Sequence, residues 1–208
     1  LVYYLQAAKW LSFRYVRILG QGEVVAEKNV EALIRGWSRL HFLTRTDRIA
    51  RYIHASPWVD RVSVYKSFDR GLVIDLDYKV PVMRSVSGRY LIDRHGHLIL
   101  SMVTNDLLRL PTFTGDKQSV GRAYQLWSRL DRWQGRLMSV SHDVFSGWEL
   151  LFDNKVTVRL GARNLSQRLD LFLKVAKHWR LFESSEAQVF DMRYNNSFSH
   201  KKIKRSVS

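Results

Sequence analysis

The chain has 208 residues, of which 46% are hydrophobic and 12% aromatic, so its composition excludes a globally disordered protein. It carries 34 Lys and Arg against 19 Asp and Glu, and the formal net charge of +15 points to an anionic partner, either nucleic acid or an anionic membrane surface. Cysteine is absent, which excludes disulfides, thiolate catalysis and cysteine metal sites.

The first thirteen residues, Leu1–Phe13, are apolar but are interrupted by Gln6 and Lys9. They fall short of the roughly 20 residues that span a bilayer. Three interpretations stay open. The segment is the end of a membrane helix that begins upstream, since the chain does not start with methionine; an interfacial helix with Tyr and Trp at the membrane surface; or an ordinary surface helix.

The next stretch predicts a strand followed by two helices. Apolar and polar side chains alternate over Tyr15–Leu19, which is typical of a strand. Helical spacing of apolar residues predicts a helix over Val24–Ile34. A second helix is predicted from Thr44, which has capping-box spacing to Asp47, and it ends before Ser56-Pro57 because a residue that precedes proline disfavours the helical conformation.

A hairpin is predicted next. Trp58 begins a run in which Val62 and Val64 face one side of a strand, and a second run alternates over Leu72–Asp77. About four residues that end at Gly71 separate the two runs, as in a hairpin turn. The order up to this point is therefore β-α-α-β-β.

The remaining chain reads as a larger mixed sheet flanked by helices, so the fold class is α+β. Val80–Met102 contains short strands broken at Ser87-Gly88 and His95-Gly96. Further elements are expected as an amphipathic helix over Ser119–Trp133, strands over Leu137–Phe145, Glu149–Phe152 and Lys155–Leu160, a long helix over Asn164–Phe182 and a closing strand over Gln188–Tyr194.

Several segments, in this order, resemble the FtsQ/DivIB family of cell-division proteins, whose extracytoplasmic part contains a POTRA domain and a β domain. They are V-R-I-L-G-Q-G at 16–22, S-P-W-V-D-R-V-S-V-Y-K at 56–66, L-V-I-D-L-D-Y-K-V-P-V at 72–82, Y-L-I-D-R-H-G at 90–96, L-P-T-F-T-G at 110–115, the tryptophan-led hairpin at 148–161 and D-M-R-Y at 191–194. The chain departs from the family pattern at Phe68-Asp69, where tryptophan-proline is usual, at Tyr78, where glutamate is usual, and at Asn195-Asn196-Ser197, where a glycine is expected.

The resemblance implies a domain plan: residues 1–13 as the end of a membrane or juxtamembrane helix, 14–82 as the POTRA domain, 83–199 as the β domain and 200–208 as a basic tail. It also implies a function. We expect a non-catalytic, bitopic scaffold of the inner membrane with this region in the periplasm at the division septum, linking early and late division proteins. Its partners would be FtsB/FtsL-like proteins and FtsW/FtsI-, FtsK- and FtsN-like members, with the N-terminal helix in the inner membrane and without a cofactor or nucleic acid.

The last strand is the main candidate for partner binding. An unpaired edge of such a strand can accept a partner strand by β-augmentation. The resemblance carries the partner-binding role to Arg193, Tyr194, Asn196, Ser197 and Phe198. The alternative is that Tyr194 only closes the core of its own domain.

A second candidate surface is the predicted edge strand around Val64 and Lys66, although Val64 also fits a core position.

Other functions find less support in the sequence. His95 and His97 could suggest a metal pair, but no cysteine or carboxylate completes a ligand set. Serine residues show no His or Asp at a nucleophile-like spacing, so no enzyme is predicted. The basic surface lacks a motif that reads bases, and a position near an anionic bilayer or an ordinary solvated surface explains it equally. The alternative function is a POTRA-containing component of outer-membrane assembly or secretion, which would show tandem repeats or a barrel.

Overall fold

The computed structural model describes residues 2–3, 13–36, 42–131, 136–181, 187–194 and 197–203. The chain divides into two compact units, one of Leu1–Val80 with Ile99–Ser101 and one of Pro81–Leu98 with Met102–Ser208. Helices and strands occur in both, which confirms the predicted α+β class. In the described part of the chain, no helix combines the length and the apolar character that crossing a bilayer requires.

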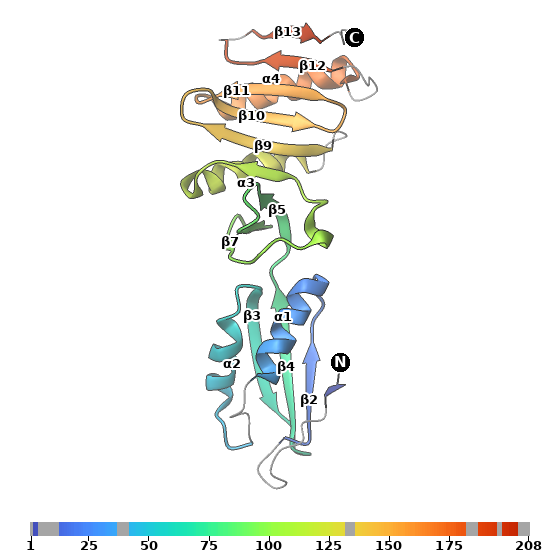
Figure 1. Ribbon diagram of the computed structural model, residues 1–208, viewed down its shortest axis with the longest axis vertical. Coiled ribbons are helices and arrows are strands. Elements are labelled where there is room, and N and C mark those ends of the chain that lie inside the picture. The colour runs from blue at the N-terminus through green and yellow to red at the C-terminus, as the bar shows by residue number, and fades with distance from the viewer. Residues whose placement is uncertain are drawn as a thin grey trace. The chain divides into compact units, whose positions relative to one another are not determined.

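The first unit is a small mixed sheet with two helices (Figure 1). Its elements are β1 (Val2–Tyr3), β2 (Tyr15–Leu19), α1 (Val24–Arg35), α2 (Thr46–His54), β3 (Val59–Lys66) and β4 (Gly71–Tyr78). From β2 onwards this is the predicted β-α-α-β-β order. The strand order is β1-β2-β4-β3; β2 runs parallel to β4, and β3 runs antiparallel to it.

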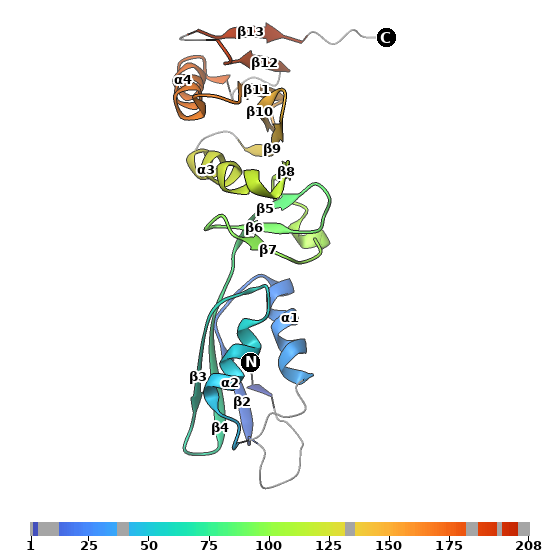
Figure 2. The same cartoon turned by 90° about the vertical axis from the view of Figure 1, so that its left-hand side faces the viewer.

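Alternation of side chains fixes which face of the small sheet is buried. In β4, Leu72, Ile74 and Leu76 are buried, whereas Asp75 and Asp77 are exposed, as predicted. Helices α1 and α2 lie on the same side of β3 and β4 (Figure 2). They bury residues spaced by four, among them Val30 and Ile34 of α1 and Ile49 and Ile53 of α2. The unit therefore has one core layer between its helices and its sheet.

Two local expectations in this unit were wrong. Helix α2 begins at Thr46 rather than at Thr44, and its N-cap residue, Arg45, makes no side-chain capping bond. The carboxylate of Asp47 instead accepts a hydrogen bond from Arg45 Nε at 3.1 Å and lies 3.6 Å from Arg51 Nη2, so it is occupied by ion pairs. Val2 and Tyr3, predicted within a helix, form the short strand β1 paired with β2; the rest of that predicted helix up to residue 12 lies outside the described residues.

The second unit is built on a nine-stranded mixed sheet. Its strands are β5 (Pro81–Ser85), β6 (Leu91–Asp93), β7 (Leu98–Ile99), β8 (Thr112–Thr114), β9 (Leu137–Asp143), β10 (Gly147–Phe152), β11 (Val156–Gly161), β12 (Gln188–Asp191) and β13 (Ser199–Lys202). The spatial order is β13-β12-β11-β10-β9-β8-β5-β6-β7. Strand β12 is parallel to β11, whereas β13 is antiparallel to β12.

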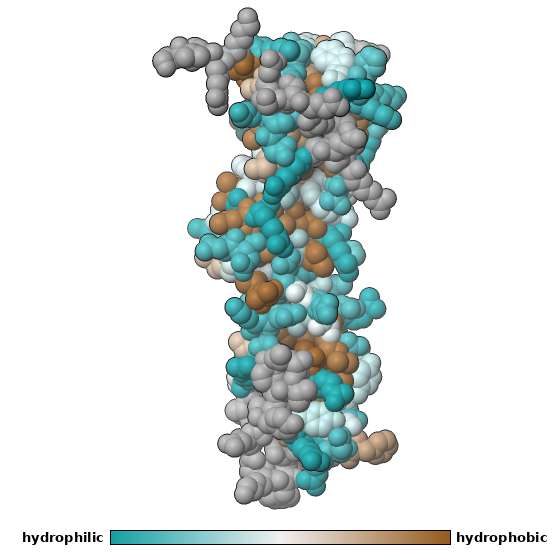
Figure 3. Space-filling model, turned by 90° about the vertical axis from the view of Figure 1, so that its right-hand side faces the viewer, coloured by the Kyte–Doolittle hydropathy of each residue, from teal (hydrophilic) through white to brown (hydrophobic). Residues whose placement is uncertain are grey.

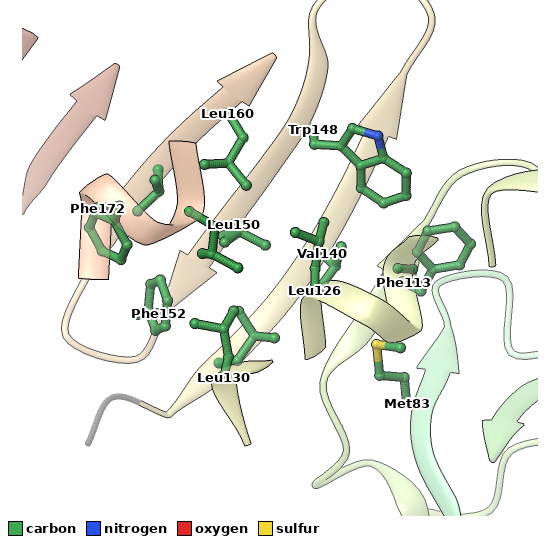
Figure 4. Packing of buried hydrophobic residues seen from close by; sticks show 14 of the residues in the cluster. Met83, Phe113, Leu126, Leu130, Val140, Trp148, Leu150, Phe152, Leu160 and Phe172 are labelled. Carbon is green, nitrogen blue, oxygen red and sulfur yellow. The ribbon is translucent and has the colours of Figure 1, made fainter. Parts of the chain in front are cut away.

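Two helices, α3 (Val120–Leu130) and α4 (Leu165–His178), cover the same face of this sheet (Figure 2). Helix α4 is the crossover between the parallel strands β11 and β12. Between helices and sheet lies a core of large apolar side chains; Trp148, Phe113 and Phe172, labelled in Figure 4, are each 1% exposed or less. Phe172 stacks on Phe152 and meets Phe190 edge-on, which ties α4 to β10 and β12.

The C-terminal end differs from expectation in one respect that matters for function. The closing strand was predicted over Gln188–Tyr194 with residues 200–208 as a basic tail. Strand β12 ends at Asp191, and Ser199–Lys202 form a further strand, β13, beside it. The segment Ser-His-Lys-Lys shows no alternation of apolar and polar side chains, so its pattern does not predict a strand.

Candidate partner-binding surfaces

The C-terminal end of β12 is held by two arginines. Arg193 binds the carboxylate of Asp191 through two nitrogens, with Nε at 2.9 Å from Oδ1 and Nη2 at 2.6 Å from Oδ2. Its backbone N–H donates to the same carboxylate at 3.1 Å. Arg168 of α4 donates to the carbonyl oxygen of Arg193 at 2.6 Å and to that of Leu160 at 2.7 Å. Helix α4, β11 and the end of β12 are thereby fixed to one another.

The Asp191–Arg193 ion pair has the bidentate geometry of a strong charge-assisted interaction. Its bidentate hydrogen bonds lower the pKa of Asp191 below the usual value for an aspartate and raise that of Arg193. The Asp191 side chain is 11% exposed, whereas that of Arg193 is 46% exposed. The guanidinium is therefore positioned by its own chain and still reaches solvent, where a carboxylate of a partner could contact it.

The predicted residues after Arg193 divide into exposed and packed ones. Tyr194 is 55% exposed, which does not fit the alternative that it closes the core of its own domain. Ser197 is exposed too, whereas Phe198 is partly buried, with its ring 5.7 Å from that of Trp179 and 6.1 Å from that of Phe190. Asn196 lies outside the described residues. Tyr194 is thus available to a partner, while Phe198 already packs within the chain.

The predicted unpaired edge of the closing strand is occupied. Strand β13 pairs with β12 in a register that sets Phe190 opposite His200 and Asp191 opposite Ser199. The pairing continues to the backbone N–H of Ile203, which donates to the carbonyl oxygen of Ala187 at 2.9 Å. Whether this edge is free was left open by the sequence; in the structure it is covered by β13, which begins eight positions after β12 ends and runs antiparallel to it.

Strand β13 is attached mainly through His200. The imidazole stacks on Phe190 with ring centroids 4.6 Å apart and meets Trp179 edge-on at 5.1 Å. Its Nε2 lies 2.9 Å from Oε1 of Gln188. Burial lowers the pKa of His200, and the nearby charge of Lys202 lowers it further, so the ring is neutral at neutral pH. The other side chains of β13, Ser199, Lys201 and Lys202, are exposed.

The second predicted surface, around Val64 and Lys66, lies on the edge strand of the small sheet. Strand β3 pairs only with β4 among the described strands, with Val64 opposite Ile74 and Lys66 opposite Leu72. Val64 is half-buried. Lys66 is exposed, and its Nζ lies 5.2 Å from the centre of the Phe42 ring, in a cation–π contact. These two residues belong to the first unit and Arg193 to Phe198 to the second, so the structure describes two separate candidate surfaces.

One polar pair was missed by sequence reasoning. Ser119 Oγ lies 2.9 Å from His142 Nδ1, although the two residues are 23 positions apart. A catalytic arrangement would need a carboxylate that orients the histidine. Asp116 instead accepts a hydrogen bond from the backbone N–H of Ser119 at 2.7 Å, and the imidazole packs on buried Trp148 at 4.6 Å. The pair joins the start of α3 to β9 and has the geometry of a structural contact.

The histidines near Gly96 are part of a turn. The carboxylate of Asp93 is fully buried and accepts hydrogen bonds from the backbone N–H groups of His95 and His97, both at 2.8 Å. Within the described ranges, no three His, Cys, Asp or Glu side chains lie where they could hold a metal ion. Asp93 therefore stabilises the turn between β6 and β7 through these two hydrogen bonds.

Comparison with known proteins agrees with this fold. The family model of the C-terminal part of the cell division protein FtsQ/DivIB matches residues 82–193, which make up more than half of the chain and most of the second unit. The fold and the match together define the class of protein: a cell-division protein whose second unit is the family's C-terminal domain, built of a mixed sheet and helices. The chain belongs to the FtsQ/DivIB family.

Individual relatives support the same family. The chain is 29% identical over 147 residues to the cell division protein FtsQ of Neisseria gonorrhoeae, a match that covers 69% of this chain and 60% of the relative. The FtsQ of Neisseria meningitidis is similar to the same extent, with 61% of its length covered. The FtsQ of Blochmanniella floridana is 29% identical over 169 residues, covering 73% of this chain and 60% of that protein. The chain thus spans about three fifths of the length of these curated relatives.

Proposed function

We propose that this chain is the partner-binding part of a non-catalytic division scaffold, which joins early and late division proteins at the septum. Membership of the FtsQ/DivIB family supports the role in cell division. The proposal extends this role to the contacts that the family resemblance implies: FtsB/FtsL-like proteins as direct partners, with FtsW/FtsI-, FtsK- and FtsN-like proteins in the same assembly. A periplasmic position, anchored in the inner membrane, belongs to the same proposal.

One observation carries the proposal. Just beyond the end of β12, Arg193, which is held by the carboxylate of Asp191, is followed directly by the exposed Tyr194. An aromatic side chain and an arginine that are fixed before binding lose little conformational entropy on association. They are the residue types that contribute most of the binding energy in many interfaces.

The basic character of the chain fits the same partner class. With a net charge of +15, the chain attracts an acidic segment over distances of about 10 Å at moderate ionic strength. Lys201 and Lys202 of β13, both exposed, add positive charge to the same outer strands, opposite Val189 and Gln188 of β12. We therefore propose that the partner contributes an extended, acidic segment, which the electrostatic attraction guides to this end of the large sheet.

The test is binding of the purified chain to the periplasmic segment of an FtsB-like protein from the same organism, measured by calorimetry. Tyr194→Ala is expected to weaken binding by about tenfold or more, because a central aromatic contact is worth at least about 1.4 kcal/mol. The matched control is Tyr65→Ala, since Tyr65 is 56% exposed on β3 and Tyr194 is 55% exposed.

The pair of variants also separates the two candidate surfaces. Loss of binding with Tyr194→Ala alone, at an unchanged melting temperature, supports the end of the large sheet. Loss with Tyr65→Ala alone moves the site to β3, where Lys66→Ala then tests the predicted contact. If the unmodified chain does not bind the segment at all, the proposed function is wrong.

A further inference from the structure

The turn between β3 and β4 carries an aromatic side chain that does not contribute to the core of its unit. Phe68 is 112% exposed, so nothing within the described chain shields its ring from solvent. A single exposed apolar side chain is common on protein surfaces and is no evidence of a binding site by itself. The residues that surround Phe68 therefore decide whether its exposure has a function.

The turn that presents Phe68 is held in place on both sides. The backbone N–H of Ser67 donates to the carbonyl oxygen of Gly71 at 2.9 Å, and the hydroxyl of Tyr15 donates to Oδ1 of Asp69 at 3.0 Å. Figure 1 shows this turn at the end of the small sheet at which β2 begins. Phe68 thus projects from a convex, fixed turn and does not line a groove.

Basic side chains surround the turn. Arg14 directly precedes β2, and its backbone N–H donates to the carbonyl oxygen of Arg70 at 2.9 Å, which brings the two arginines together. Lys66 ends β3 just before the turn, and the side chains of all three basic residues are exposed. Asp69 is the one acidic residue within 13–15, 42–45 and 66–71. The end of the small sheet is therefore positively charged around its protruding ring.

A second apolar side chain lies at the same end. Leu43 is 69% exposed and follows Phe42 in sequence. The ring of Phe42 lies 5.2 Å from Nζ of Lys66 and 5.8 Å from the ring of buried Phe13, so the backbone that carries Leu43 is packed beside the ends of β2 and β3. Two exposed apolar side chains and three exposed basic ones therefore share this end of the unit.

From these observations we infer that this end of the small sheet, with Phe68 and Leu43 at its surface, docks on an anionic phospholipid bilayer. Basic side chains are attracted to anionic headgroups, and apolar side chains beside them enter the boundary between headgroups and acyl chains. Aromatic rings are favoured at that depth. A protein partner would bind a protruding ring in a complementary pocket, whereas a bilayer receives it without a preformed shape.

The position of this end along the chain agrees with a bilayer. Arg14 directly follows the apolar segment Leu1–Phe13, for which two of the three interpretations place the segment in or on a membrane. The inference rests on the membrane position proposed above and adds the surface through which the first unit contacts the lipid.

The first experiment measures co-sedimentation of the purified chain with vesicles of equal parts phosphatidylglycerol and phosphatidylcholine. Phe68→Ala is expected to weaken binding at least about fivefold, because the ring no longer enters the interface. Phe145→Ala is the matched control: Phe145 is 98% exposed in the turn between β9 and β10 of the second unit, where neighbouring residues 143–147 carry no positive charge. Equal losses in the two variants, or no binding by the unmodified chain, overturn the inference.

A second pair of variants separates a local basic surface from the general attraction of a chain with a net charge of +15. Arg14→Gln and Arg122→Gln each remove one positive charge, and both arginines are exposed. Because a basic side chain close to an anionic bilayer strengthens binding by about fivefold, we expect that loss for Arg14→Gln and almost none for Arg122→Gln on α3. Equal losses would mean that the whole surface attracts the vesicle, and the inference would be wrong.

A fluorescent label reports directly which end meets the lipid. The chain has no cysteine, so Phe68→Cys and Phe145→Cys each carry a single thiol for an environment-sensitive dye. Docking predicts a blue shift and quenching by spin-labelled lipid for the dye at position 68 and neither effect at position 145. The reverse pattern, or no response at position 68, contradicts the inference.

Binding of the FtsB-like segment, measured in solution without lipid, keeps this inference distinct from the proposed function. Phe68→Ala is expected to leave that binding unchanged, since Tyr194 belongs to the other unit. A loss of segment binding in Phe68→Ala would show that the turn contacts a protein and would overturn lipid docking. If the chain binds vesicles as expected but not the segment, the proposed partner is wrong and the lipid contact stands.

Discussion

The two sheets end on strands that are secured in different ways. In the small sheet, β3 pairs with β4 over eight residues from Val59 to Lys66, and fully buried Trp58 directly precedes it. In the large sheet, β13 pairs over four residues and depends on two rings that pack against half-exposed Trp179. An outer strand is therefore an integral part of its core in one unit and an added layer in the other.

This difference has a consequence for binding. A strand whose removal would open the core cannot be exchanged without unfolding, whereas a strand attached at the surface can leave while the fold persists. Hydrophobic side chains are present on the molecular surface, but on the face shown in Figure 3 they are interspersed with hydrophilic ones. On this face, strand pairing is thus a better basis for the proposed partner binding than a continuous apolar patch.

The strongest test of this difference between β3 and β13 is to replace the tryptophan that packs beside each strand. Trp58→Ala is expected to lower the free energy of unfolding by about 3–5 kcal/mol, because it leaves a large cavity beneath β3. Trp179→Ala should cost less than about 2 kcal/mol, because the side chain is already 45% exposed. Urea denaturation followed by far-UV circular dichroism measures both.

Hydrogen exchange on the second variant adds a local test. In Trp179→Ala the amides of β13 should lose protection while those of β10 and β11 keep it. Equal losses of stability in the two variants, or a loss of protection throughout the large sheet, would contradict the view that β13 is an added layer.

The second comparison concerns one turn glycine in each unit. Gly20 directly follows β2 and has φ +105°, and a Cβ there would lie 2.1 Å from the carbonyl oxygen of Leu76. Gly88 has φ +68°, but no atom lies within 4 Å of its Cβ position. We expect Gly20→Ala to cost about 2–4 kcal/mol, from backbone displacement and left-handed strain together, and Gly88→Ala about 1 kcal/mol from strain alone. Thermal unfolding monitored by calorimetry checks both, and similar costs would mean that β4 yields to the added methyl group.

Sequence patterns predicted the small unit well because its signals are local. Leu72, Ile74 and Leu76 alternate with exposed residues over a long strand, and a glycine closes the hairpin, so period and turn chemistry agree. The exception is the predicted capping box at Thr44. Asp47 forms ion pairs with Arg45 and Arg51 instead, and the spacing rule takes no account of such competing partners.

The candidate site was predictable only in part, because its decisive contacts are not local. The sequence indicated Arg193 and Tyr194 through a resemblance, and the structure adds that Asp191 holds Arg193 while Tyr194 stays exposed. Strand β13 could not be predicted, since its attachment depends on Trp179 and Phe190, which the long helix α4 and β12 bring together. Trp179 itself is 45% exposed and lies at the margin of the core.

The smallest expected effects come from one ion pair in each unit. Asp191 binds Arg193 in bidentate fashion with its carboxylate largely buried, whereas Arg61 and Asp77 pair at 3.4 Å with side chains that are 78% and 60% exposed. At neutral pH we expect Asp191→Asn to cost about 1–2 kcal/mol and Asp77→Asn at most about 0.5 kcal/mol. Urea denaturation of each variant beside the unmodified chain measures the two differences.

Dependence on pH distinguishes the buried pair from a packing effect. Because Arg193 lowers the pKa of Asp191 in the folded chain, the contribution of this carboxylate to stability is complete above its unfolded pKa of about 4 and is lost as the pH falls through the lower folded value. The unfolding free energies of the unmodified chain and of Asp191→Asn should therefore differ by a constant amount at higher pH and converge in acid. A difference that persists unchanged in acid would show that Asp191→Asn destabilises the fold through altered packing and not through loss of the ion pair. Arg193 would then be held in place mainly by Arg168 of α4.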